Sequence, residues 1–255
     1  MNAFPCLRRA LLVEARKAAA SGTLRATTII LVAGIALLSG TFALMRSGGS
    51  DAVSVKLALL LRGSGWTALI NGAEQVTAAG ALPAFGLGLS WIIGREFSDR
   101  TISGLFALPV PRRTIALAKL VVYAVWCALV SLLAVAALAI VGLLVFGAPD
   151  GDALLALGRE AVLAVLTARL AVPCAWAATL SRGVLAGIGA AAGIVVVAQV
   201  GILGGAGPWF PLASPALWAL GLASVPIGAL ALVGTVPVLF GALTVWAWSR
   251  MQLDR

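Results

Sequence analysis

The chain has 255 residues, of which 62% are hydrophobic and only 11% are charged, and its mean hydropathy is +1.09. Soluble domains carry roughly 25% charged residues, so this composition excludes a soluble globular protein and indicates an integral membrane protein. The net charge is +9, but the basic residues lie mostly beside apolar segments. Membrane topology therefore explains them better than nucleic-acid binding does. The long apolar runs predict an all-α membrane protein rather than a barrel.

The N-terminal segment, residues 4–20, is predicted to be an amphipathic helix. Leu7, Leu11 and Ala15 share one face at a spacing of four residues, and Arg9 and Arg16 share another. A basic amphipathic helix ahead of the first span is typical of a segment that lies on the inner membrane surface.

Six stretches are near or above the roughly 20 apolar residues that cross a bilayer. We therefore predict a single transmembrane domain over residues 1–255 with six spans, at about 26–45, 67–93, 114–146, 161–181, 184–204 and 227–249. With the N-terminus inside, thirteen Lys and Arg residues fall in inner segments, whereas the outer loop between the first two spans holds three. This asymmetry predicts that both termini are cytoplasmic.

The segment between the second and third spans, residues 94–113, is a polar island in an apolar chain. It combines a charged collar, which includes Arg95, Asp99 and Arg100, with a short apolar helical turn that ends at Pro109 and Pro111. Two interpretations fit: an inner loop that only follows the positive-inside rule, or a docking surface for a soluble partner that pushes on the membrane spans.

The order of residues in this island resembles a loop of the type-2 ABC transporter permeases. The resemblance is carried by Gly94-Arg95-Glu96-Phe97, Arg100-Thr101, Leu105, Ala107-Leu108-Pro109, Pro111-Arg112 and Ala118-Lys119. In motif it covers about 25 residues, whereas in layout, with six spans and a basic N-terminal helix, it extends over the whole chain.

The resemblance implies a permease subunit that pairs with an identical or paralogous permease and binds two copies of an ATPase subunit on the cytoplasmic side. ATP and Mg²⁺ would be bound by that partner, so no cofactor or metal is expected in this chain. The residues expected to couple the chain to the ATPase are Glu96, Phe97, Asp99, Arg100, Thr101, Leu105, Phe106, Arg112 and Arg113. We expect Glu96 to cap the short helix that follows, and Leu105 and Phe106 to fill a groove in the ATPase.

Arg169 is the one charge placed deep within a predicted span, and such residues are functional candidates. It either forms a structural ion pair or bonds to backbone carbonyls, or it faces a cavity and touches an anionic or amphiphilic substrate. Glu74, in the outer half of the second span, is a possible partner, and both residues are candidates for the translocation path. Glu160, with Arg159, Asp150 and Asp152, is expected to form a polar cap at the membrane interface.

Residues 183–249 contain no charged side chain, although they include the loop between the last two spans. That loop is predicted to fold back into the outer leaflet as short helices broken by Gly and Pro. An ordinary interfacial loop, anchored by Trp209 and Phe210, fits the sequence equally well.

Catalysis of the soluble type is excluded by the lack of histidine and of a GxxxxGK[ST] phosphate loop, so the chain is not expected to be an enzyme. The predicted function is that of the permease of an ATP-driven exporter for an amphiphile, peptide antibiotic, drug or lipid. A stand-alone secondary transporter or channel is the alternative, although no inverted repeat supports it. The preference for Arg over Lys and the Ala/Gly richness suggest a GC-rich bacterial genome, and we expect the chain in the bacterial inner (cytoplasmic) membrane.

Overall fold

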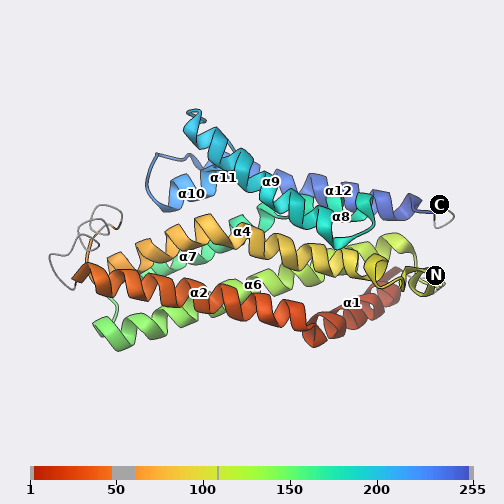
Figure 1. The fold of residues 1–255 in the computed structure, drawn as a ribbon, viewed down its shortest axis with the longest axis horizontal. Helices are drawn as coiled ribbons and strands as arrows, with labels where there is room; N and C mark the ends of the chain where they lie inside the picture. The colour runs from red at the N-terminus through yellow and green to blue at the C-terminus, as the bar shows by residue number, and fades with distance from the viewer. Residues whose placement is uncertain (1–2, 48–60, 62, 108, 253–255) are drawn as a thin grey trace.

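The structure is a computed structural model that describes residues 3–47, 61, 63–107 and 109–252. The described residues form helices and turns without a strand (Figure 1). The helices are α1 (Ala3–Ala20), α2 (Gly22–Ser47), α4 (Trp66–Ser98), α5 (Ile102–Phe106), α6 (Arg112–Phe146), α7 (Gly151–Leu170), α8 (Pro173–Ser181), α9 (Val184–Leu203), α10 (Ser214–Ala219), α11 (Ile227–Val233) and α12 (Thr235–Arg250).

Six segments are long and apolar enough to cross a membrane, as the sequence predicts. They are Gly22–Arg46, Trp66–Ser98, Arg112–Phe146, Gly151–Ser181, Val184–Leu203 and Ile227–Arg250. Two of them are interrupted. The fourth span breaks between α7 and α8, where Pro173 begins the second helix, and the sixth breaks at Gly234 between α11 and α12. Pro173 occupies the first turn of α8, where a backbone N–H has no partner within the helix. The missing N–H of proline therefore costs α8 no hydrogen bond.

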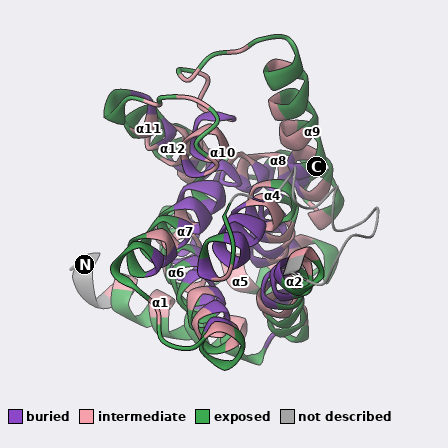
Figure 2. Cartoon of the chain, turned by 90° about the vertical axis from the view of Figure 1, so that its left-hand side faces the viewer, coloured by how far each residue is buried: buried purple, intermediate pink, exposed green. Residues whose placement is uncertain are grey.

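The helix α4 forms the centre of the bundle and packs against α2, α6, α7, α8 and α9. Figure 2 shows buried residues concentrated on α4 and α7, while the outward faces of α2, α6 and α9 are exposed. These exposed faces are apolar, with Leu144 81% and Leu203 87% accessible. Such surfaces are expected where a helix meets lipid, because lipid chains are as apolar as leucine.

Small residues bring α4 close to the start of α9. A Cβ atom on Gly94 would lie 2.8 Å from the carbonyl carbon of Gly183, and one on Gly187 would lie 2.2 Å from Ser90 Oγ. Close backbone approach through small residues is the usual means by which membrane helices associate. The contact fixes the end of α4 that leads directly into the polar island.

The predicted N-terminal helix is confirmed as α1, although its placement on a membrane surface stays a prediction. The loop between the last two spans contains one short helix, α10, which packs against α4 and α7. Its re-entry into the outer leaflet likewise stays a prediction. The first residues of α1, the turn between α4 and α6, and the last residues of α12 all lie at one end of the bundle (Figure 1).

Candidate functional site

The polar island begins with a tight helix stop. Arg100 lies in the left-handed region at φ 57°, its N–H donates to Phe97 O at 3.2 Å, and Thr101 N–H donates to Glu96 O at 2.9 Å. These two bonds form a Schellman motif, which ends α4 at Ser98 and turns the chain into α5. The expectation that Glu96 caps α5 is therefore wrong, because α4 continues past Glu96 and Thr101 occupies the N-cap position of α5, where no side chain accepts a capping hydrogen bond.

Glu96 instead belongs to a closed ring of two acidic and two basic side chains. Lys17 Nζ lies 2.7 Å from Glu14 Oε1 and 2.8 Å from Glu96 Oε1. Lys119 Nζ lies 2.8 Å from Glu14 Oε2 and 2.6 Å from Glu96 Oε2. We call these four residues the ion-pair ring. It joins α1, α4 and α6, three elements that are far apart in the sequence.

Burial makes the ring energetically significant. Lys119 is fully buried, and Glu14 and Glu96 are 5% and 4% accessible. Lys119 Nζ donates hydrogen bonds to Glu14 Oε2 at 2.8 Å and to Ile92 O at 3.0 Å, whereas its 2.6 Å contact with Glu96 Oε2 is an ion pair without a hydrogen bond. A buried charge is tolerated only when it is paired and hydrogen-bonded, and the ring meets both requirements with zero net charge.

The ring also sets the protonation of its outer members. Burial opposes ionisation of Glu14, but the charges and hydrogen bonds of Lys119 and Lys17 outweigh it and hold the pKa of Glu14 below its ordinary value. Burial likewise opposes the charge on Lys17, but hydrogen bonds to Glu14 and Glu96 and their negative charges raise the pKa of Lys17. Both residues are therefore ionised at neutral pH.

An aromatic cluster holds α5 against the end of α12. Trp248 is fully buried, and its ring centroid lies 5.8 Å from that of Phe97 and 6.0 Å from that of Phe106, both edge-on. The Arg112 guanidinium lies 4.3 Å above the Phe106 ring and donates to Met251 O. Such contacts add about 0.5–1.5 kcal/mol each beyond area burial.

Phe106 is half-buried and its ring packs edge-on against Trp248, so its expected insertion into a groove of the ATPase stays a prediction. Arg112 likewise faces inward. Leu105 and Phe97 are half-buried. The residues of the predicted coupling set that are exposed to solvent are Asp99, Arg100, Thr101 and Arg113.

The charges toward the other end of the bundle are arranged differently from the expectation. Glu74 is fully buried, and its Oε1 accepts a bond of 2.6 Å from Arg159 Nε, so the structure pairs Glu74 with Arg159 and not with Arg169. Glu160 is also fully buried and accepts a 2.5 Å bond from Thr77 Oγ1. It therefore lies between α4 and α7 and is not part of a polar cap at the interface.

Arg169 is exposed and lines a cavity of about 370 Å³ between α6, α7 and α12. Tyr123, Cys127, Val172 and Pro237 are among the other lining residues, so the charge stands against a mainly apolar wall. Across the described residues, no group of three or more His, Cys, Asp and Glu side chains is placed to hold a metal ion.

Sequence reasoning missed Glu14 as a functional residue. The signal is present: Leu7, Leu11, Glu14 and Ala18 follow a spacing of four, three and four residues, so the acidic residue of α1 lies on its apolar face. A lone carboxylate in that position requires a buried cation, and the sequence alone does not say that Lys119, 105 residues away, provides it.

A family comparison agrees with the layout of helices. The sequence model described as "ABC-2 family transporter protein" matches residues 23–201, which is 179 of the 255 residues. The match includes all of the second, third and fourth spans, nearly all of the first and fifth, and the whole α4–α6 turn. A comparison with curated protein sequences gives no significant match.

Proposed function

Since the chain belongs to the ABC-2 family of transporter proteins, we propose that it is the permease subunit of an ATP-driven exporter. In this proposal it forms the translocation path with a second permease subunit, identical or paralogous. Two separate ATPase subunits bind ATP and Mg²⁺ and dock on residues 94–113. The membrane is the bacterial inner membrane, with both termini in the cytoplasm.

The observation that carries this proposal is the rigid attachment of α5 to three membrane elements. The ion-pair ring joins the last turns of α4 to α1 and α6, and Trp248 joins α5 to α12. A force applied to α5 by a soluble partner is therefore transmitted to α1, α6 and α12 together. A passive loop has no need of a four-charge ring with three buried members at its base.

The exposed side of the turn supplies the docking surface. Asp99, Arg100, Thr101 and Arg113 project into solvent next to the fixed apolar residues of α5. Charges at the rim of an interface mainly set its specificity and association rate, whereas half-buried apolar residues, here Leu105, contribute more to affinity.

The exported substrate is proposed to be an amphiphile, peptide antibiotic, drug or lipid. Arg169 supports this class, because a cation on an apolar wall within a membrane span suits a molecule that has an anionic head and an apolar body. Glu74 is neutralised by Arg159 and is better suited to a structural link between α4 and α7 than to substrate contact.

The test is purification of the tagged chain from its native membranes, followed by measurement of ATP hydrolysis and of bound subunits. We expect a nucleotide-hydrolysing subunit to co-purify with the wild-type chain and to be lost from the double variant Arg100→Glu/Arg113→Glu. The matched control is Asp152→Lys, an equally exposed charge change at the far end of the bundle. ATP hydrolysis by this chain alone, or equal recovery of the ATPase with both variants, would refute the proposal.

A further inference from the structure

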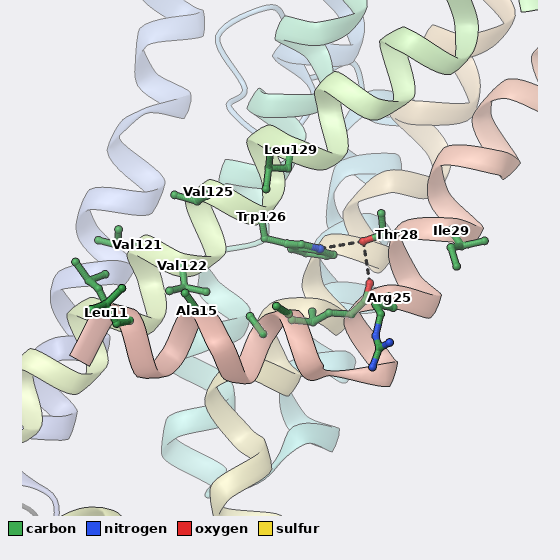
Figure 3. Close-up of a pocket in the computed structure, with 14 residues that line it drawn as sticks. Leu11, Ala15, Arg25, Thr28, Ile29, Val121, Val122, Val125, Trp126 and Leu129 are labelled. Atoms are coloured by element: carbon green, nitrogen blue, oxygen red, sulfur yellow. Dashed lines mark hydrogen bonds between the residues drawn. The ribbon is translucent and has the colours of Figure 1, made fainter. Parts of the chain in front are cut away.

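A deep apolar groove lies on the outside of the bundle, away from both the ion-pair ring and the cavity at Arg169. It runs along α1 and is closed on its other sides by α2 and α6, with a volume of about 610 Å³ (Figure 3). Binding sites for small ligands have volumes of about 300–1,000 Å³. Its walls include Leu11 and Ala15 of α1, Ile29 of α2, and Val125 and Leu129 of α6.

Apart from Arg25, the groove presents almost no polar surface, because the polar groups of Trp126 and Thr28 are hydrogen-bonded. Trp126 Nε1 donates to Thr28 Oγ1 at 2.9 Å, and Thr28 Oγ1 donates to Leu24 O at 2.8 Å (Figure 3). The lining residues are nevertheless open to the outside, with Ile29 66%, Val125 55% and Leu129 54% accessible. A groove of this kind offers water no partners, so it requires an apolar occupant.

The end of the groove carries a positive charge. Arg25 lines the groove near the last turn of α1, and its guanidinium donates to Ala20 O at 2.9 Å and to Ser21 O at 3.4 Å. A guanidinium has five N–H donors, so others remain for an anion at the mouth of the groove. The apolar stem of an arginine suits this position, because it covers apolar surface while the head stays polar.

We propose that the groove binds an anionic phospholipid, with one acyl chain along α1 between Leu11 and Trp126 and its phosphate on Arg25. Charge complementarity selects this occupant, because Arg25 is the charged residue among those that line the groove and the chain has a net charge of +9. Basic residues at the end of a first membrane span meet lipid head groups directly. The inference needs a bilayer around the chain but does not depend on export or on an ATPase.

The experiment is quenching of tryptophan fluorescence by brominated lipids in vesicles that contain the purified full chain. The difference between wild type and Trp126→Phe isolates the Trp126 signal. We expect brominated phosphatidylglycerol to reach half-maximal quenching of Trp126 at about fivefold lower mole fraction than brominated phosphatidylcholine, the effect of one basic residue at a membrane surface.

Variants separate the head group from the chain. Arg25→Gln should remove the preference for phosphatidylglycerol, Arg25→Lys should keep most of it, and Arg16→Gln, an exposed residue outside the groove, should leave it unchanged. Ala15→Phe should reduce quenching of Trp126 by both lipids, because it fills the groove. Equal quenching by the two lipids in the wild type would mean ordinary annular lipid and would overturn the proposal.

Two further results would also overturn it. One is quenching of Trp126 that is weak at first and becomes stronger as the protein is diluted into excess lipid. That result would show that a second copy of the chain covers the groove. The other comes from native mass spectrometry, which does not need the Trp126→Phe variant to fold. If wild type and Arg25→Gln retain phosphatidylglycerol to the same extent, Arg25 does not bind the lipid phosphate.

Discussion

Lys119 is the position where the ion-pair ring can be tested most directly. It is fully buried and contributes two ion pairs, to Glu14 at 2.8 Å and to Glu96 at 2.6 Å. Lys119→Met keeps a similar side-chain length but leaves two buried carboxylates with Lys17 as their common cation. Removing one partner from a buried ion pair costs about 3–5 kcal/mol, because an uncompensated buried charge remains. We expect a loss of unfolding free energy of that size.

A second substitution should restore part of this loss. In the double variant Lys119→Met/Glu96→Gln the remaining pair, Glu14 and Lys17, is again neutral. Residues of one charge network show coupling energies of about 0.5–3 kcal/mol, and we expect about 2 kcal/mol here because the burial is deep. The double variant should therefore be more stable than the sum of the two single effects predicts.

The assay is SDS titration of the purified chain in mixed micelles, followed by tryptophan fluorescence and circular dichroism. The matched control is Arg113→Met, an exposed residue on the same helix, whose effect should stay within about 0.5 kcal/mol. Additive effects of the two ring substitutions, or a loss for Lys119→Met no larger than that of the control, would refute the ring as a coupled buried unit.

Three further outcomes are expected. The folded pKa of Glu14 is lowered, so the ring's stabilisation should be lost as pH falls below 4.5, the ordinary pKa of Glu14; the folded pKa of Lys17 is raised, so stabilisation should also be lost as pH rises above 10.5, the ordinary pKa of Lys17. Unfolding midpoints measured from pH 3.5 to 11 check this. Glu14→Gln should flatten the acidic side of the curve of midpoint against pH. Arg100→Gly should raise stability by about 0.5–1 kcal/mol, because glycine adopts the left-handed conformation without strain; an unchanged or lower midpoint would count against the helix stop described above. Trp248→Ala should cost about 3–5 kcal/mol and speed amide exchange in α5, whereas Trp246→Ala, 54% exposed, should change neither by a measurable amount.

The number and position of the membrane spans were predictable from the sequence, because the physics is local. A run of about 20 apolar residues crosses a bilayer whatever lies elsewhere in the chain. The observed boundaries differ from the predicted ones by a few residues at most spans. The fourth span differs by ten residues, because it begins at Gly151 and not near Ala161. There, Arg159 and Glu160 lower the local hydropathy, yet both have partners on α4: the exposed Arg159 pairs with the buried Glu74, and the buried Glu160 accepts a bond from Thr77.

The polar island was recognisable from its composition and from its resemblance to a permease loop, but its residue roles were not. Glu96 was expected to cap α5, and Phe106 was expected to fill a groove in the ATPase. They face inward because their partners, Lys119 and Trp248, come from helices that the sequence does not place beside them. Charge type and aromatic character can be read locally, whereas the direction of a side chain depends on what packs against its helix.

The sequence by itself therefore determined that this chain is helical, with six segments long and apolar enough to cross a membrane and one charged turn between the second and third of them. Apolar length and charge density require this independently of packing. Only the tertiary structure decided that Glu14 completes a neutral buried ring and that the groove beside Trp126 remains open. Both depend on the angle and distance between α1 and α6, and those follow from the simultaneous satisfaction of buried charges contributed by α1, α4 and α6.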